Sequence, residues 1–336
     1  MTSGARLDTN WRFRGFQVLT LENVLLRVDV IPELGGKIYN FIYKPFDRNF
    51  LWHNPRIELR KVPLGANYND NYAGGWDELF PNDAAVEFQG ESLPDHGELW
   101  CQTWDYEVLK QDSEQVSIRL WRYGSVTQTL MEKSITLRRD EPMLRFHHRL
   151  TNLSDRELFF LWKLHPSLAV GRDHRIDVAA KKVILADLGP MFPDRFAGKV
   201  REYIWPTALE SDGRQHDVRA VLPPESKVAE VHFCVELVDG WCALTDTRNK
   251  VGFGLSFSKE LFTTVWVLML YGGWRGLYHV ILEPCTAYPR DLQKAVQTGR
   301  VGHLRGGETL ETDVVAVAYS NRASVSKIGA DGEVEA

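Results

Sequence analysis

Apolar and polar residues alternate one by one along most of this chain. In the segment QVSIRLW, for example, Val116, Ile118 and Leu120 share one side of an extended chain, and polar residues lie between them. The same period recurs in VLLRVDVI, GKIYNFIYK, LRFHHRL, ELFFLWKLH, VGFGLSFS and DVVAVAYS. A period of two residues is typical of a β-strand with one buried face. The pattern therefore predicts a protein built mainly from strands.

The segments between these strands are short and rich in turn residues, such as LSDR, DGW and DTRNK. Only PRDLQKAVQ, from Pro289, has a helical pattern, with proline at its start. The run LFTTVWVLMLYGGW is too short to span a bilayer and predicts a strand buried on both faces. Many strands without intervening helices predict an all-β fold, a large antiparallel sandwich or barrel.

The chain shows no internal repeat and no linker over residues 1–320, which predicts a single domain there. With 336 residues, of which 44% are hydrophobic, the chain is long enough to bury a large core. The remaining segment, NRASVSKIGADGEVEA, is polar and consists mostly of small residues. We therefore expect residues 321–336 to form a disordered tail.

The charge balance and the cysteines narrow the class of protein. Lys and Arg number 40 against 45 Asp and Glu, so there is no basic excess of the kind that nucleic-acid binding requires. The N-terminal stretch has no apolar run that resembles a signal peptide. Four scattered cysteines without a C-x-x-C pair favour free thiols in a reducing cytosol over a zinc or redox site. We expect a cytoplasmic protein with no nucleic-acid or membrane partner, either a monomer or a homodimer.

Common nucleophile, phosphate and metalloprotease motifs do not occur, so histidines and carboxylates beside turns are the candidates for chemistry. His96 lies in PDHGELW, where an ordinary surface histidine is the alternative interpretation. His165 is predicted to end an apolar strand in FLWKLHPSL, just before Pro166, where active-site groups often lie. The alternative interpretation of His165 is a core histidine that is hydrogen-bonded to a backbone carbonyl. The alternation places Lys163 on the same face as His165.

A carboxylate inside an apolar strand is the strongest of these signals. Glu283 lies in YHVILEPCTAYP, and Pro284 is predicted to stop the strand directly after it. Because a bare carboxylate is costly to bury, Glu283 must be paired, hydrogen-bonded or functional. A structural ion pair is the alternative to a catalytic role.

The stretch GGWDELFPND combines loop-forming residues with a tryptophan and several carboxylates. We expect a loop here rather than the interior of a strand. A sugar has apolar C–H faces and a rim of hydroxyl groups, and a loop of this composition suits both.

Six segments, taken in order, resemble the galactose mutarotase-like superfamily, which includes the aldose 1-epimerases. These are VIPELGGKIYNFIYK, NFLWHNP, GGWDELFPN, DHGELW, FLWKLHP and LEPCT. The resemblance that they carry in this order extends over nearly the whole chain. The resemblance implies a β-supersandwich whose concave sheet binds a sugar. It also implies that Glu283 is the general base, His165 the acid and His96 an assisting histidine. The chain departs from the best-known aldose 1-epimerases because GGWDELFPND replaces their Asn-Arg segment.

The predicted function is therefore that of a sugar mutarotase, an isomerase that interconverts anomers through ring opening. Glu283 would take the proton of the C1 hydroxyl, and His165 would protonate the ring oxygen. This chemistry requires no metal and no cofactor. The partner would be a small sugar, neutral or acidic. The residues expected to bind it are Trp76, Asp77, Glu78, Asn82, Lys163 and Trp274.

Two other functions remain open at this stage. The same His/Glu pair could serve an isomerase, epimerase or lyase that acts on an oxidised or acidic sugar. The eleven tryptophans also fit a non-catalytic carbohydrate-binding protein. The sequence identifies neither the sugar nor the anomer.

Overall fold

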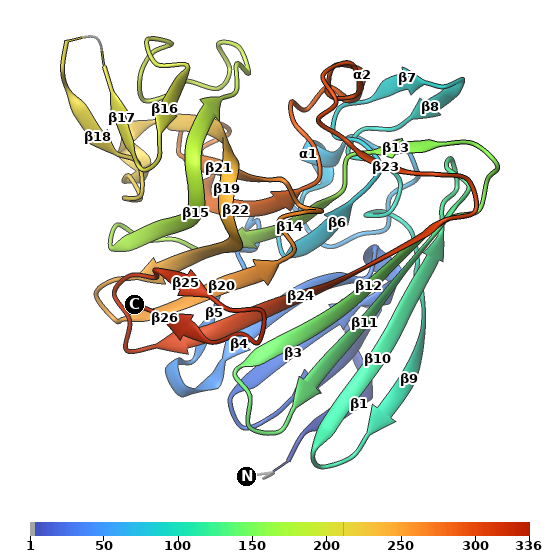
Figure 1. The fold of residues 1–336 in the computed structure, drawn as a ribbon. Helices are drawn as coiled ribbons and strands as arrows, with labels where there is room; N and C mark the ends of the chain where they lie inside the picture. Colours follow the sequence, from blue (N-terminus) through green and yellow to red (C-terminus); the bar gives the residue numbers. More distant parts are fainter. Residues whose placement is uncertain (1–3, 211) are drawn as a thin grey trace.

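Strands make up most of the regular structure in the computed structural model, which describes residues 4–210 and 212–336 (Figure 1). Twenty of them are linked in one large sheet. They are β1 (Arg6–Phe13), β2 (Phe16–Glu22), β3 (Leu26–Ile31), β4 (Lys37–Tyr43), β5 (Arg48–Asn49), β6 (Trp76–Leu79), β9 (Asp105–Gln111), β10 (Gln115–Tyr123), β11 (Thr129–Arg138), β12 (Met143–Asn152), β14 (Lys163–Leu168), β15 (His174–Leu185), β16 (Glu202–Ile204), β17 (Thr207–Leu209), β18 (Gln215–Asp217), β19 (Val228–Asp246), β20 (Val251–Phe257), β21 (Thr264–Tyr271), β22 (Tyr278–Cys285) and β24 (Thr309–Ser320).

The remaining elements are short. Three two-stranded sheets pair β7 (Val86–Phe88) with β8 (Glu91–Leu93), β13 (Leu158–Phe160) with β23 (Gly302–Leu304), and β25 (Lys327–Ile328) with β26 (Val334–Glu335). The helical segments are α1 (Tyr68–Asn71), α2 (Leu292–Gln297), η1 (Pro32–Leu34), η2 (Lys44–Phe46) and η3 (Pro224–Ser226). The predicted helix is therefore present as α2, whereas α1 was not predicted.

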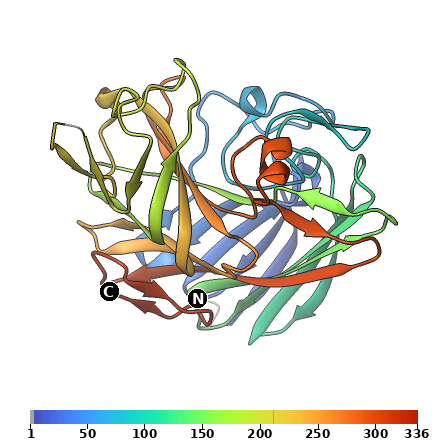
Figure 2. The same cartoon turned by 45° about the horizontal axis from the view of Figure 1, so that its top comes forward.

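The large sheet folds over into two layers. One layer runs β9–β10–β11–β12–β24–β20, and the other runs β1–β2–β3–β4–β6–β14–β22–β21. The long strand β19 joins them, because residues 228–234 pair with β21 and residues 241–246 pair with β20. Strands β15 to β18 extend the sheet at one end, and this extension projects from the body in Figures 1 and 2. The predicted all-β antiparallel sandwich is confirmed.

Residue alternation sorts the side chains of the central strands between the core and the opposite face. On β14, β21 and β22 the residues that enter the core are apolar, for example Leu164, Val267 and Leu282. Each such side chain contributes about 1.5–3 kcal/mol when fully buried. The alternate residues point to the other face, where β14 and β22 carry His165 and Glu283. We call this surface of β14, β21 and β22 the site face.

Two of the sequence predictions about strand ends are wrong. Strand β14 continues through Pro166 to Leu168, and β22 continues through Pro284 to Cys285. The two strands pair before and after the prolines but not beside them, because a proline has no N–H to donate to a ladder. The pairs on either side, Lys163 with Cys285 and Ser167 with Ile281, place His165 directly opposite Glu283.

The segment GGWDELFPND also differs from the prediction of a loop. Its centre is strand β6, which pairs with β14 and is buried along its whole length. The preceding Gly74 and Gly75 have positive φ angles and form the turn into the strand. This buried strand can hold the carboxylates Asp77 and Glu78 because each of them has a buried cationic partner, as described below.

Residues 321–336, which we expected to be disordered, form the β25–β26 hairpin instead. Val325 and Ile328 are buried there and pack in a cluster with Trp241, Val317 and Tyr319. The small polar residues of this segment form turns around two apolar anchors. The composition alone therefore did not reveal the packing.

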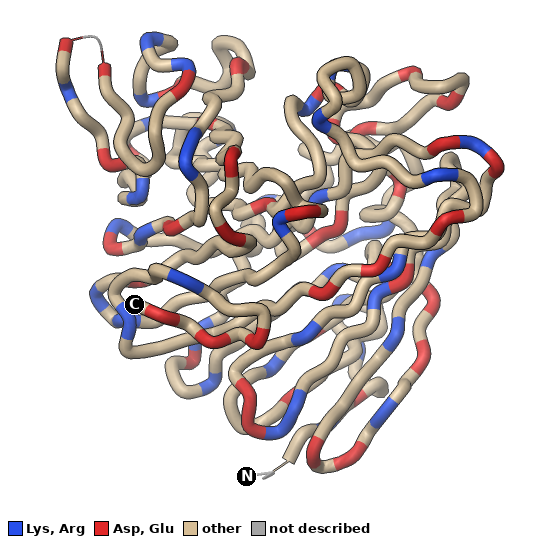
Figure 3. The backbone as a smooth tube through the Cα atoms, viewed as in Figure 1, with Lys and Arg blue, Asp and Glu red and all other residues tan. Residues whose placement is uncertain are grey.

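Charged residues of both signs are interspersed along the chain (Figure 3). Many form pairs between neighbouring segments, such as Arg6 with Glu22 at 2.7 Å and Arg139 with Glu114 at 2.6 Å. Within the described residues, the helices are all too short or too polar to cross a lipid bilayer.

Candidate active site

A cavity opens on the site face of β14, β21 and β22. It holds about 570 Å³ of space, including the open solvent at its mouth. Its polar lining consists of Asn69, Asp83, His96, Lys163, His165, Glu283 and Arg290. Its apolar lining consists of Leu188, Phe192, Val231, Phe233, Trp266, Leu268 and Trp274. A polar end and an aromatic wall therefore share one small hollow.

Glu283 and His165 meet at the polar end of this cavity. Glu283 Oε2 lies 3.8 Å from His165 Nε2, and both side chains are almost fully buried. They lie side by side on the same wall, because each belongs to one of two neighbouring strands. A ligand in the cavity would therefore lie over both groups rather than between them.

Lys163 links Glu283 to a second carboxylate, Asp83. Lys163 Nζ lies 3.0 Å from Glu283 Oε2 and 2.5 Å from Asp83 Oδ1, and it sits 4.5 Å from the centre of the Trp266 ring. Burial opposes the charged ammonium, but the two carboxylates outweigh it and hold the pKa of Lys163 above its ordinary value. Lys163 therefore remains a cation that is already paired. Arg290 donates to the other oxygen of Asp83 at 2.8 Å.

Burial shifts the pKa values of the His/Glu pair towards each other. It raises the pKa of the Glu283 carboxyl above its ordinary value, although Lys163 acts in the opposite direction. It also holds the pKa of His165 well below its ordinary value, and the Lys163 charge adds to this effect. His165 is consequently a neutral imidazole at neutral pH. Such opposed shifts in one cavity are typical of acid–base sites.

A chain of buried polar groups continues behind His165. His165 Nδ1 lies 3.2 Å from Tyr68 Oη, and the Tyr68 hydroxyl donates to Asp77 Oδ2 at 2.8 Å. Lys37 Nζ lies 2.6 Å from the other oxygen of Asp77. Tyr68 was not among the predicted site residues; it lies on the one-turn helix α1 in a polar stretch. The unusual density of tyrosine and asparagine in ANYNDNY was the available signal.

His96 is held by an unusual backbone conformation. Its φ is +58°, and the next residue, Gly97, has φ +74°. A Cβ on Gly97 would collide with the carbonyl oxygen of Phe80, which explains the glycine in the DHGELW motif. His96 Nδ1 lies 2.9 Å from Asp95 Oδ1, and its ring stacks on Tyr68 with centroids 4.2 Å apart. His96 thus reaches the cavity from a constrained turn.

The structure brings five of the nine predicted site residues to the cavity. They are His96, Lys163, His165, Trp274 and Glu283. Trp274 was predicted to bind a sugar. In the structure its ring stacks on that of Phe192, with centroids 5.5 Å apart. Asp83, Trp266 and Arg290 were not predicted, although Asp83 ends the GGWDELFPND segment that we had singled out.

Four predicted sugar-binding residues do not line the cavity, because β6 is a buried strand with alternating faces. Asp77 lies behind Tyr68, as described above. Trp76 packs in the core, with its ring 5.1 Å from that of Phe146. Glu78 points to the core face and pairs with Lys133 at 2.9 Å and His148 at 3.0 Å. Asn82 lies beyond β6, and its amide donates to the backbone carbonyls of Ala84 and Pro94, on either side of the β7–β8 hairpin.

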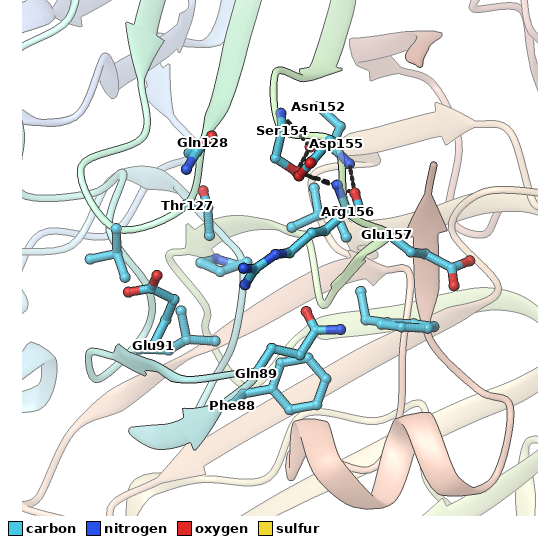
Figure 4. Close-up of a pocket in the computed structure, with 15 residues that line it drawn as sticks. Phe88, Gln89, Glu91, Thr127, Gln128, Asn152, Ser154, Asp155, Arg156 and Glu157 are labelled. Carbon is cyan, nitrogen blue, oxygen red and sulfur yellow. Dashed lines mark hydrogen bonds between the residues drawn. The ribbon is translucent and has the colours of Figure 1, made fainter. Parts of the chain in front are cut away.

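A second, larger hollow lies between the β7–β8 hairpin and the turn after β12 (Figure 4). Its charged residues, Glu91, Asp155, Arg156 and Glu157, are all exposed. The dashed lines in Figure 4 show Asn152 and Ser154 bonded within their own turn. We place the candidate site in the smaller of these two hollows because its titratable lining residues are mostly buried, whereas the charged residues of the larger one are exposed. Across residues 4–210 and 212–336, no cluster of three or more His, Cys, Asp or Glu side chains is suited to hold a metal ion.

Comparison with known proteins identifies the fold. No protein-family model and no curated protein sequence matches the chain. Several solved structures, however, align with this chain over most of its length. The Slr1438 protein from Synechocystis sp. PCC 6803 aligns with a TM-score of 0.63 at 17% identity over 94% of this chain and 98% of its own. A candidate aldose 1-epimerase from Klebsiella pneumoniae aligns with a TM-score of 0.73 at 13% identity, over 94% of this chain and 83% of its own.

A galactose mutarotase related enzyme from Lactobacillus acidophilus aligns with a TM-score of 0.60 at 15% identity, over 92% of this chain and 100% of its own. At these identities the likeness concerns the fold. The chain has the galactose mutarotase-like fold, as the resemblance in its sequence predicted.

Proposed function

We propose that this protein is a sugar mutarotase of the aldose 1-epimerase type, with Glu283 and His165 as its acid–base pair. The observation that carries the proposal is the position of these two buried groups, 3.8 Å apart on one wall of a small cavity. In a cyclic aldose the anomeric hydroxyl and the ring oxygen are bonded to the same carbon. Two proton-transferring groups that lie side by side can therefore reach both oxygens at once.

The reaction transfers two protons and breaks and re-forms one bond. One group takes the proton of the C1 hydroxyl while the other gives a proton to the ring oxygen, and the bond between C1 and the ring oxygen breaks. The resulting aldehyde rotates about its bond to C2. The same two transfers then run backwards and close the ring on the other face of C1. The protein ends in its starting protonation state, so no co-reactant is needed.

The rest of the cavity suits a sugar. Trp266, Trp274 and Phe192 offer aromatic surfaces to the apolar C–H faces of a pyranose. Lys163 is already paired with Asp83 and Glu283, which favours a neutral sugar over one whose acidic substituent needs this cation. Burial of the pair keeps competing water away from the transferred protons.

The test is anomer exchange measured by NMR magnetisation transfer over a panel of aldoses. We expect the protein to accelerate exchange of at least one sugar, and Glu283→Gln and His165→Asn to reduce the rate by about 100-fold or more. Glu91→Gln, in the second hollow, is the matched control and should leave the rate unchanged. Sugar binding without any exchange would instead identify a carbohydrate-binding protein.

One observation favours a second candidate reaction at the same site. The fixed Lys163 cation, 3.0 Å from Glu283, could stabilise the oxyanion that develops when a carbon-bound proton is removed next to a carbonyl. This would suit an isomerase, epimerase or lyase that acts on an oxidised sugar. Incorporation of deuterium from heavy water at a sugar carbon would distinguish this reaction, because anomer exchange labels no carbon.

A further inference from the structure

We infer that Arg195 is a positioning residue for the cavity. It locks residues 188–195, which we call the strap, across the edge of β19, and the lock holds Phe192 where it closes one end of the cavity. The lock is argued from contacts in the structure alone. Its consequence, that Phe192 limits the substrate to a single sugar ring, rests in addition on the proposed function.

The strand register shows that the cavity has two ends. Trp266 and Glu283 lie side by side on β21 and β22, at the end that holds the acid–base pair. Leu270 is four residues further along β21, and there it packs with Phe192 and Trp274. Four residues of a strand span about 13 Å. Once the side chains at each end are allowed for, this length accommodates one sugar ring but not two.

The strap passes from one face of the sheet to the other. Phe192 lies on the site face, where it lines the cavity. The carbonyl of the next residue, Pro193, accepts a hydrogen bond of 2.9 Å from the backbone N–H of Ala229, on the edge of β19 away from β21. Arg195 then reaches the opposite face, where its Nη2 lies 3.3 Å from Sδ of the core residue Met269. Arg195 therefore has no part in the lining of the cavity.

Glu230 on β19 forms the lock with Arg195. Arg195 Nε donates to Glu230 Oε1 at 2.6 Å, and the backbone N–H of Arg195 donates to Oε2 at 3.0 Å. The Arg195 side chain is 7% exposed, and that of Glu230 is fully buried. Burial opposes the charge of Glu230, but His232 and Arg195 outweigh it and lower its pKa to about 2. One buried carboxylate thus fixes both the side chain and the backbone of Arg195.

The contacts of Phe192 itself are weaker than this lock. Phe192 is half-buried, and its backbone N–H donates at 3.1 Å to Gly189, which belongs to the strap as well. Its ring stacks on that of Trp274, with an angle of 19° between the planes. Because Phe192 is three residues from Arg195, the position of its ring depends on the ion pair on the far side of the sheet.

Arg201 offers a matched control, because it forms an ion pair next to the strap on the surface. Its Nη2 lies 3.5 Å from Asp187 Oδ2, and both side chains are more than half exposed. Exposed pairs of this kind contribute little to stability. Arg201→Met should therefore leave the strap in place.

Hydrogen exchange of the full chain, measured by mass spectrometry without any sugar, tests the lock. Arg195→Met should speed exchange at the amide of Ala229 about tenfold or more, while the amides of β14 and β22 keep their rates. Arg195→Met combined with Glu230→Gln should do the same, and this double variant leaves no unpaired carboxylate that could prevent folding. Unchanged exchange at Ala229 in the folded double variant would overturn the inference, as would equal acceleration in Arg201→Met.

Anomer exchange of an aldose and of a disaccharide that carries this aldose at its reducing end tests the limit on size. The unaltered protein should have a kcat/KM at least about tenfold higher for the aldose. Phe192→Ala and the double variant should both reduce this preference, mainly through KM, because the strap lies away from the acid–base pair. Arg201→Met should retain it. Equal kcat/KM values in the unaltered protein, or an undiminished preference in Phe192→Ala, would contradict the role of Phe192.

The two measurements separate this inference from the proposed function. If the protein binds sugars without exchange, the proposed function fails, and the Kd values of the same two sugars replace kcat/KM in the comparison. If it binds neither sugar, the limit on size is overturned together with the proposed function. The hydrogen-exchange result then still decides whether Arg195 locks the strap.

Discussion

Replacement of Lys163 by methionine should be among the most destabilising single changes in this protein. Lys163 lies between Asp83 and Glu283, and all three side chains are at most 5% exposed. Methionine fills a similar volume but removes the charge, so Glu283 loses its cation while Asp83 keeps Arg290 at 2.8 Å. Breaking a buried ion pair by removing one partner costs about 3–5 kcal/mol. We expect a loss of this size in the free energy of unfolding at pH 8.

The loss should become smaller as the pH falls. Burial already raises the pKa of Glu283, and removing Lys163 raises it further, so the variant is relieved when Glu283 takes up a proton. Asp83 has a pKa well below its ordinary value, because Lys163 and other cations outweigh the burial that opposes its charge. Its stabilising contribution is present above the ordinary pKa of an aspartate and is lost as the pH falls. Both pH 5 and pH 8 lie above the ordinary pKa of an aspartate, about 3.9, so the Asp83 contribution is present at both. Glu283 alone therefore makes the deficit of the variant larger at pH 8 than at pH 5.

Urea unfolding at the two pH values measures the effect, and a double variant identifies its cause. Lys163→Met combined with Glu283→Gln removes both the cation and the carboxylate that it leaves unpaired. The pair should be coupled, so the double variant should be more stable than the sum of the single losses by about 0.5–3 kcal/mol. Lys110→Met, at an exposed surface pair, should cause no measurable loss. Strict additivity, or a deficit independent of pH, would refute the reasoning.

Two further predictions concern the backbone and the chain end. Gly97→Ala should destabilise the protein by more than about 1 kcal/mol in urea unfolding, because a Cβ there meets a backbone carbonyl. Gly90→Ala has a similar positive φ but no atom within 4 Å, so it is the control that shows the cost of strain alone. Deletion of residues 322–336 should cost about 3 kcal/mol or more, because it removes the buried side chains of Val325 and Ile328. An unchanged unfolding midpoint would show that the hairpin does not pack.

The strand pattern was enough to predict the fold class and the faces of the central strands. A period of two places His165 and Lys163 on one face, and a lone carboxylate in an apolar strand identifies Glu283 as unusual. These are local signals, carried by a few neighbouring residues. The pairing of the two strands is not local, because it depends on which segments meet across more than a hundred positions. The sequence resemblance suggested that meeting, and the register of β14 and β22 explains it.

The errors have a common physical origin. Pro166 and Pro284 were interpreted as strand ends because proline cannot donate to a ladder, but their missing donors face an unpaired stretch where none is needed. Trp76 and Glu78 were assigned to a loop because glycine and proline flank them. The burial of β6, which brings a partner to each carboxylate, overrides that local preference. Tyr68 was missed because a one-turn helix leaves no periodic signal.

The position of His165 and Glu283 on two neighbouring strands has a consequence for how such a protein can diversify. Both members of the His/Glu pair are anchored in neighbouring strands of a rigid sheet, whereas Phe192 and Trp274 approach from segments outside those strands. Substitutions in the outer segments can reshape the space for a substrate without disturbing the spacing of the two central groups. Under the proposed function, substrate selectivity and proton transfer therefore belong to separate parts of the molecule, and each can evolve while the other is conserved.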